Sequence, residues 1–293
     1  MSTQQTAKTQ YVNSPSGATF AYRQIGTGLG TPLVLITHFR GTMDKWDPLI
    51  INNLAASRRS AADITEFLEL IGEVEVDLLG FSIGGYVAQL VALNSDPSKV
   101  KIRKLILAGT GTSYGEELAF SPNEDVGSVA GVKDVSIETF KTLFFPKNRE
   151  GNAAAEAWWA RIHERSASTS GEEVSQWLSY GFEDQAKGLL AQVKQGQDFT
   201  SKAETSQGAE GAYDRLSELN MPVLVANGSN DYMIPTSNSY LICQRVPNGQ
   251  LILYPNSGHG FLFQMESSLR LFTTLRRDVP YWFFTLRVSR GLW

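Results

Sequence analysis

Short apolar runs that end in polar or glycine-containing turns recur along this chain and alternate with stretches of helical periodicity. Short, mainly apolar runs at residues 32–37, 76–79, 104–108, 222–226 and 251–254 predict buried strands. Residues 86–93 have the composition of a helix, and residues 11–12 and 18–24 flank a turn, which predicts an antiparallel hairpin at the start of the chain. The pattern as a whole predicts an α/β fold with a mostly parallel sheet.

The stretch between residues 108 and 212 differs from the rest, because it has no clear run for a buried strand. Apolar residues at turn-like spacing predict helices over 135–145, 152–165 and 172–187. We therefore expect a core built from residues 1–112 and 212–293, interrupted by a helical insertion at residues 113–211.

The turn between the strand at 76–79 and the helix at 86–93 carries the most informative motif, Gly80-Phe81-Ser82-Ile83-Gly84-Gly85. A serine at a sharp turn from strand to helix, with glycine two positions away on each side, is the pattern of a nucleophile elbow. The serine there has a strained backbone, and the crowded turn excludes neighbouring side chains. We interpret Ser82 as a nucleophile, against the alternative of a serine in an ordinary glycine-rich turn.

A serine nucleophile needs a base and an acid that orients the base. The chain has three histidines, and His259 follows the strand-like run at 251–254. Asp231 follows the preceding run at 222–226. A single loop Asp or His is usually a cap or a surface residue, but here the chain order of Ser82, Asp231 and His259 is the order found with this elbow. We predict that these three residues are catalytic.

These motifs resemble the α/β-hydrolase superfamily, specifically its cofactor-free serine hydrolases with a helical lid, which include esterases, peptidases and haloperoxidase-like enzymes. The matching segments are residues 33–41, 80–85, 228–235 and 257–261. The resemblance implies that the insertion at residues 113–211 is the lid. A serine at the elbow argues against the dehalogenases and epoxide hydrolases of this fold, which place an aspartate there.

The resemblance also implies an oxyanion hole formed by two backbone N–H groups. One is that of Ile83, and the other is that of Phe39 or Arg40, where Phe39 replaces a usual glycine. His38 is expected to organise this loop through hydrogen bonds, with a role as a second base as the alternative. Most aromatic side chains of the lid are expected to form its own core. A minority should line an apolar pocket over the nucleophile, with Trp158, Trp159 and Trp177 as candidates.

No cofactor or metal is expected. The glycines at 26–30 precede a strand instead of joining a strand to a helix, and residues 109–111 open into a polar segment without a full dinucleotide motif. The chain has no P-loop, no His-Glu-x-x-His motif, and too few histidines and cysteines for a zinc site.

Composition indicates which partners and which cellular location to expect. The chain has 293 residues, of which 42% are hydrophobic, and a net charge of −4, which argues against a nucleic-acid partner. Cys243 is the single cysteine, the first ten residues lack the apolar core of a signal peptide, and no apolar run approaches the length of a membrane span. We expect a cytoplasmic protein with a small-molecule substrate and no membrane partner; the oligomeric state is left open.

The sequence departs from the family pattern in two places. After the predicted helix at 46–56 the chain continues directly into a second helix at 61–72, without the interior strand that the family places there. Residues 266–274 could begin the closing helix of the family, but Pro280 and an aromatic cluster at 281–284 follow, with no evident partner face. Contact of these aromatics with a membrane surface, beside the arginines at 276, 277, 287 and 290, is one interpretation. We hypothesise that both departures mark a deletion or a misread splice boundary.

The expected function is hydrolysis of a small-molecule carboxylic ester or related acyl bond through a Ser-His-Asp triad and an acyl-enzyme. The alternative from another class is a catalytically inactive or truncated hydrolase-like protein that binds a ligand in an apolar lid pocket. Hydroxynitrile-lyase-like chemistry on the same three residues is a third interpretation. The triad alone does not separate ester, amide, thioester and carbon–carbon bonds.

Overall fold

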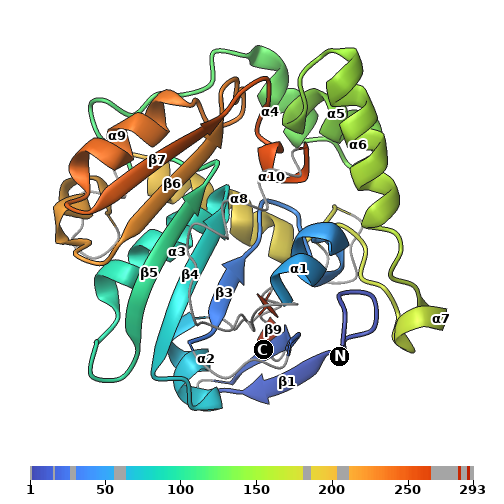
Figure 1. Cartoon of the computed structure of the whole chain (residues 1–293), viewed down its shortest axis with the longest axis horizontal. Helices are drawn as coiled ribbons and strands as arrows, with labels where there is room; N and C mark the ends of the chain where they lie inside the picture. The colour runs from blue at the N-terminus through green and yellow to red at the C-terminus, as the bar shows by residue number, and fades with distance from the viewer. Residues whose placement is uncertain are drawn as a thin grey trace.

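A computed structural model of the whole chain describes residues 2–15, 17–26, 31–55, 64–180, 186–202 and 211–264, with two short strands at 283–284 and 289–290. Five parallel strands in the order β3-β4-β5-β6-β7 form the central sheet (Figure 1). Their bounds are β3 Leu33–Ile36, β4 Glu75–Phe81, β5 Lys101–Ala108, β6 Val223–Gly228 and β7 Gly249–Tyr254. The predicted α/β fold with a mostly parallel sheet is confirmed.

The strands distribute their side chains to two apolar cores, one on each face of the sheet, because successive residues of a strand point to opposite sides. Leu105 and Leu107 of β5 join the core that contains α2 (Ile64–Ile71), α3 (Ile83–Asn94) and α9 (Ser237–Arg245). Ile106 and Ala108 join the opposite core, which contains α1 (Pro48–Ala55), α5 (Ile137–Phe144), α6 (Arg149–Arg161) and α10 (Phe261–Gln264). The apolar end of β5, residues 105–108, is therefore buried on both faces of the sheet.

Helices follow one another between β5 and β6. They are α4 (Glu124–Ala130), α5, α6, α7 (Ala167–Ser170) and α8 (Lys187–Thr200), and the short 3₁₀ helix η3 (Tyr213–Glu218) leads into β6. Residues 113–180 and 186–202 contain no strand. The division of the chain into a core and a lid remains a prediction, and we call residues 124–200 the helical segment.

The expectation of a helix over 172–187 is wrong for residues 172–180, which are irregular. Backbone groups that a helix would use internally have partners elsewhere in the fold. Ser175 N–H donates to Asp44 Oδ2 at 2.7 Å, and Leu178 N–H donates to the carbonyl oxygen of Arg40 at 3.1 Å. These partners lie more than 130 residues away in the sequence, so helical spacing alone could not reveal them.

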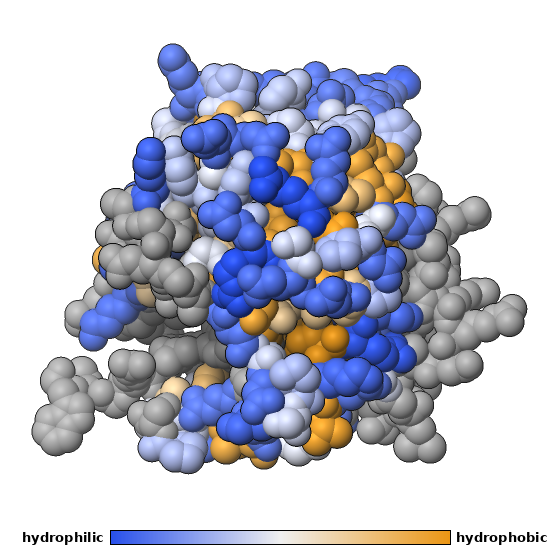
Figure 2. Space-filling model, turned by 90° about the vertical axis from the view of Figure 1, so that its left-hand side faces the viewer, coloured by the Kyte–Doolittle hydropathy of each residue, from blue (hydrophilic) through white to orange (hydrophobic). Residues whose placement is uncertain are grey.

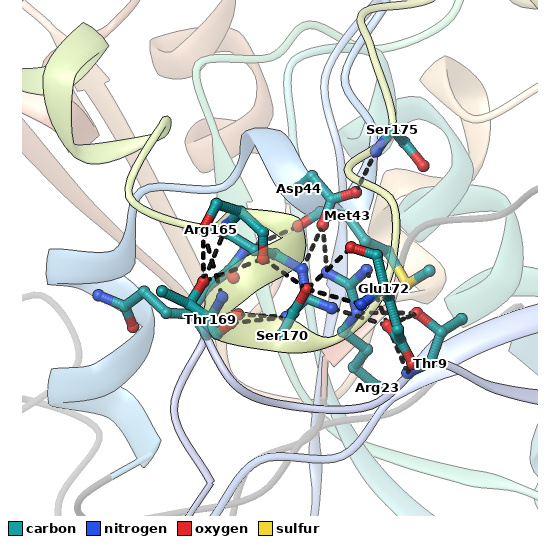
Figure 3. A network of polar contacts seen from close by, with 12 residues as sticks. Thr9, Arg23, Met43, Asp44, Arg165, Thr169, Ser170, Glu172 and Ser175 are labelled. Atoms are coloured by element: carbon teal, nitrogen blue, oxygen red, sulfur yellow. Dashed lines mark hydrogen bonds and ion pairs between the residues drawn. The ribbon is translucent and has the colours of Figure 1, made fainter.

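A buried ionic cluster fastens this irregular stretch to the start of the chain (Figure 3). Asp44 accepts from Arg23 at 2.5 Å and forms an ion pair with Arg165 at 2.9 Å. Arg165 also pairs with Glu172 at 2.8 Å, and Glu172 accepts from the backbone N–H of Thr9 at 2.9 Å. The cluster thereby joins the segment before the first hairpin, the loop after β3 and the helical segment.

The opening hairpin is confirmed, with β1 at Gln10–Asn13 and β2 at Ala18–Arg23. It belongs to a separate sheet from the five parallel strands. Two short strands near the end of the chain, β8 (Phe283–Phe284) and β9 (Ser289–Arg290), pair antiparallel with β2 on the side away from β1. The backbone of β8 also lies beside β3. The backbone of residues 283–284, in the aromatic cluster at 281–284, therefore has a partner strand that was not evident from the sequence.

The expected absence of a strand after residue 56 concerns a stretch that is not among the described residues. This stretch, residues 56–63, lies between α1 and α2 in the sequence. The possible helix at 266–274 also lies outside the described residues. The hypothesis of a deletion or misread splice boundary stays untested.

The surface is mainly polar where Figure 2 views it, from the left side of Figure 1, with smaller hydrophobic areas between hydrophilic side chains. Large apolar side chains that are exposed lie on different elements and include Tyr11, Val74, Phe120 and Leu190. Such scattered exposure is ordinary for a folded protein. In the part of the chain that the structure describes, no helix is long and apolar enough to cross a bilayer.

Candidate active site

Ser82 lies at the tip of the turn between β4 and α3, in a backbone conformation that non-glycine residues rarely adopt. Its φ is 58° and its ψ is −127°. The backbone N–H of Ser82 donates to the carbonyl oxygen of Ala108 on the neighbouring strand at 2.9 Å, which holds the turn against the sheet. Surrounding structure thus maintains a local strain of the kind that clusters at functional sites.

The glycines on either side of Ser82 are required by the close approach of neighbouring backbone. A Cβ on Gly80 would lie 2.3 Å from the carbonyl oxygen of Gly84. A Cβ on Gly84 would lie 2.3 Å from the carbonyl oxygen of Ile36 at the end of β3. Side chains at these positions would therefore collide with backbone, as the sequence motif predicts.

The structure brings Ser82, His259 and Asp231 together at the carboxyl ends of three strands. His259 Nε2 lies 3.0 Å from Ser82 Oγ, and His259 Nδ1 lies 2.7 Å from Asp231 Oδ2. Ser82 follows β4, Asp231 follows β6, and His259 follows β7. These are hydrogen-bond distances from a hydroxyl to an imidazole and from the imidazole to a carboxylate.

Asp231 is held in place by its own loop. Its second carboxylate oxygen, Oδ1, accepts from the backbone N–H groups of Met233 at 2.8 Å and Ile234 at 3.0 Å. The backbone N–H of Asp231 donates to Thr236 Oγ1 at 3.3 Å. One oxygen is thus satisfied by amides while the other is directed at the imidazole, which fixes the direction of that bond.

The imidazole of His259 is fully buried between two aromatic side chains. It stacks on the ring of Phe81, with centroids 5.2 Å apart at 29°, and meets the ring of Phe144 edge-on at 5.2 Å. The loop around it is anchored by Gly260, whose backbone N–H donates to the Phe144 carbonyl oxygen at 2.7 Å. These contacts determine the plane of the imidazole as well as its position.

The structure distinguishes the backbone N–H groups of Phe39 and Arg40, the two alternatives for one donor of the expected oxyanion hole. The backbone N–H of Arg40 donates to Gln192 Oε1 of α8 at 2.8 Å and is therefore occupied. The N–H groups of Phe39 and Ile83 have no hydrogen-bond partner among the described residues. Sequence reasoning missed Gln192, because nothing near position 192 marks a residue that acts 152 positions away.

His38 forms a hydrogen bond within its own loop. Its Nδ1 lies 2.9 Å from the carbonyl oxygen of Phe39. Since a carbonyl only accepts, Nδ1 carries the proton and Nε2 has a free lone pair. Burial lowers the pKa of His38 to about 3. The hydrogen bond to Phe39 raises this pKa and the nearby His259 lowers it, but both effects are smaller than that of burial. His38 is therefore a neutral imidazole at ordinary pH.

A small pocket opens beside Ser82. Its walls are the loop at residues 38–40, side chains of the helical segment, and Met233 from the loop of Asp231. The contributors from the helical segment are Ala130, Val135, Thr139, Phe140, Leu143 and Phe144. The pocket is thus mostly apolar, with a few polar groups at one end, as is usual for small-molecule sites.

The three tryptophans proposed for this pocket do not line it in the structure. Trp158, Trp159 and Trp177 instead contact the ring of Phe140, at centroid distances of 5.0, 5.8 and 4.5 Å. They form an aromatic layer behind a residue that does line the pocket. Helical spacing predicted that these side chains share a cluster, but it could not tell which of them reaches the cavity.

Comparison with known proteins identifies the family. A family model described as alpha/beta hydrolase fold matches residues 56–265, so the chain belongs to the α/β-hydrolase fold family. The solved structure of an alpha/beta hydrolase fold protein from Chitinophaga pinensis is similar, with a TM-score of 0.71 and 28% identity over 93% of this chain and 98% of that chain. An esterase, RhEst1 from Rhodococcus sp. ECU1013, shares the fold with a TM-score of 0.59 and 19% identity, over 91% of this chain and 98% of that chain.

Curated relatives of this chain are hydrolases. One is 2-hydroxy-6-oxononadienedioate/2-hydroxy-6-oxononatrienedioate hydrolase 2 of Pseudomonas putida, which is 24% identical over 216 residues. A hydrolase of the same substrates from Cupriavidus pinatubonensis is 26% identical over 217 residues. Each match covers 73% of this chain and 66% of the relative, so the chain spans slightly less than two thirds of the relatives' length.

Proposed function

We propose that this protein is a serine hydrolase that cleaves a small-molecule carboxylic ester or a related acyl bond through a covalent acyl-enzyme. The observation that carries the proposal is the continuous hydrogen-bonded series from Ser82 Oγ through His259 to Asp231, with distances of 3.0 and 2.7 Å. A positioned base and an orienting carboxylate are what a serine hydroxyl needs to act as a nucleophile at neutral pH.

In the acylation step, His259 Nε2 accepts the proton of the Ser82 hydroxyl as Oγ attacks the substrate carbonyl. Asp231 keeps the other nitrogen protonated and stabilises the imidazolium that forms. The negative charge on the carbonyl oxygen is stabilised by the N–H groups of Ile83 and Phe39, each worth about 3 kcal/mol of the barrier. His259 then returns the proton to the leaving group.

In the deacylation step, a water molecule donates a proton to His259 and attacks the acyl carbon, which releases the acid and restores Ser82. Phe81 and Phe144 keep the imidazole in the plane that serves both steps. The helical segment covers the site from the side of α5, and we propose that it acts as the lid of the pocket.

Labelling with a fluorophosphonate probe tests this proposal. The wild type should form a covalent adduct that is absent in Ser82→Ala, and it should hydrolyse short acyl esters with a burst of the first product. A folded wild type that neither labels nor hydrolyses would instead support the alternative, a hydrolase-like protein that only binds a ligand. Circular dichroism of both proteins establishes that they are folded.

The names of the curated relatives favour one second candidate, hydrolysis of a carbon–carbon bond in a keto-dioate. The same serine and histidine can serve such a reaction, because fold and triad host several bond types. The 2-hydroxy-6-oxononadienedioate named for the relatives separates the two candidates: cleavage of that compound without cleavage of simple esters would favour the carbon–carbon reaction. A cytoplasmic location remains a prediction from the single cysteine.

A further inference from the structure

Arg40 is a buried cation in the wall of the pocket that contains Ser82. It is 3% exposed, and its φ of 63° places it in the left-handed region, where a non-glycine residue is uncommon. Its backbone is held at both ends, because its N–H donates to Gln192 and its carbonyl oxygen accepts from Leu178. The loop therefore places this side chain at the site independently of what the guanidinium binds.

The guanidinium has unused donors. Nη2 donates to the carbonyl oxygen of Val132 at 2.5 Å, whereas Nε and Nη1 are buried and have no hydrogen-bond partner among the described residues. The rings of Phe39 and Tyr180 lie 5.7 and 5.8 Å from the guanidinium carbon. Asp134 attracts the charge from a distance, and no carboxylate in the described part of the chain forms an ion pair with Arg40.

Two other buried arginines of this protein have a carboxylate partner. Arg23 and Arg165, whose side chains are 5% and 1% exposed, both pair with Asp44. Burying an unpaired cation is costly, and proteins avoid it unless a partner is supplied. A buried arginine with two unpaired donors beside a nucleophile is therefore a site for an anionic ligand.

We propose that Arg40 binds a carboxylate of the substrate, so that the protein acts on acyl compounds that carry a negative charge a few bonds from the scissile carbonyl. This inference rests on the proposed function and names its substrate class. The planar fork of a guanidinium matches a carboxylate, and the two can form parallel hydrogen bonds. The pocket that Arg40 lines also contains Ser82, so a carboxylate held by the guanidinium belongs to the same bound molecule as the scissile carbonyl.

The experiment compares matched charged and neutral esters. Monoethyl esters of succinic, glutaric and adipic acids carry the carboxylate in the acyl part, and the corresponding diethyl esters are the neutral comparators. In a second pair, 3-acetoxypropanoate carries the carboxylate in the leaving group, and its methyl ester is the neutral comparator. For the wild type we expect kcat/KM to be at least tenfold higher for the charged member of the best pair.

The variant Arg40→Gln removes the charge and keeps both backbone bonds. The ratio of kcat/KM for the charged over the neutral ester should fall by about 10- to 100-fold, which is the range for hydrogen bonds to a charged group. Arg40→Lys should retain part of the preference. Arg149→Gln is the matched control, because the Arg149 side chain is 94% exposed and does not line the pocket; it should leave the ratio unchanged.

The outcomes separate the inference from the proposed function. Wild type that labels with fluorophosphonate but shows no preference for either charged ester overturns the role of Arg40 and leaves the hydrolase proposal in place. An equal loss on charged and neutral esters in Arg40→Gln also overturns it, since that would indicate a role in shaping the loop. Wild type that neither labels nor hydrolyses overturns both. If Arg40→Gln does not fold, inhibition of the wild type by glutarate but not by 1,5-pentanediol supports the site, and equal effects contradict it.

Discussion

A Cβ on Gly228 would lie 2.2 Å from the carbonyl oxygen of Gly258, so the loop that carries Asp231 and the loop that carries His259 meet backbone to backbone. Their contact is reinforced by the N–H of Asn230, which donates to the carbonyl oxygen of Ser257 at 3.0 Å. The 2.7 Å distance between the carboxylate and the imidazole therefore depends on a glycine that lies outside the proposed triad.

We expect Gly228→Ala to displace these two loops. Overpacking of this kind should lower the free energy of unfolding by about 1–3 kcal/mol and reduce ester hydrolysis further than this loss of stability explains. Urea denaturation and initial rates measure the two effects. Gly196→Ala is the matched control: beyond its chain neighbours and the backbone of its own helix, nothing in the described part of the chain lies within 4 Å of a Cβ there. The site is inside α8, so the change should stabilise the protein by up to about 1 kcal/mol. Equal activity of Gly228→Ala and wild type would contradict the interpretation.

Asp231→Asn tests the orienting carboxylate without changing the size of the side chain. The amide cannot stabilise the imidazolium and favours the wrong tautomer of His259, so kcat should fall by about 10⁴-fold, the size of the loss when the triad aspartate of a serine protease becomes asparagine, while folding is retained. The measurement is steady-state ester hydrolysis together with the rate of fluorophosphonate labelling. Asp214→Asn, at an exposed position, is the control and should behave as wild type. A loss of less than about tenfold would argue that Asp231 does not act on the imidazole.

The buried His38 should make the protein less stable in acid. Burial lowers its pKa to about 3 in the folded state, whereas an unfolded histidine has a pKa of about 6.5. Between these values the unfolded chain binds the proton and the folded chain does not, so the contribution is fully present above pH of about 6.5 and is lost as the pH falls, at about 1.4 kcal/mol per unit. Replacing His38 by Gln should reduce the difference in unfolding free energy between pH 7 and pH 5 by about 2 kcal/mol in urea titrations. Parallel pH profiles for the two proteins would contradict this account.

Removing the carboxylate at the centre of the buried ionic cluster should be costly. The Asp44 side chain is fully buried, and Asp44→Asn leaves Arg23 and Arg165 without their shared negative partner. We expect a loss of about 3–5 kcal/mol in unfolding free energy, measured by urea denaturation. Asp198→Asn provides the comparison, because its pair with Lys194 is solvent-exposed and should be worth less than about 1 kcal/mol. Similar losses for the two variants would show that burial does not control the energy of these pairs.

The three residues of the proposed triad could be predicted from the sequence because each signal is local. Ser82, Asp231 and His259 all come shortly after an apolar run. The carboxyl ends of parallel strands lie at one edge of a sheet, so residues that follow such strands converge in space even when they are far apart in the chain. The glycines of the elbow were equally visible, because the steric need for them arises within a few residues and from the adjacent strand end.

What the sequence alone determined was therefore the strand pattern, the parallel sheet and the candidates for nucleophile, base and acid. Only the tertiary structure decided that the N–H of Arg40 donates to Gln192 and that residues 172–180 are irregular instead of helical. It also decided that Phe140 lies between three tryptophans and the pocket. The physical reason is the range of the interactions. Periodicity and turn chemistry act between near neighbours, whereas these features depend on hydrogen bonds and packing between segments that meet only once the chain has folded.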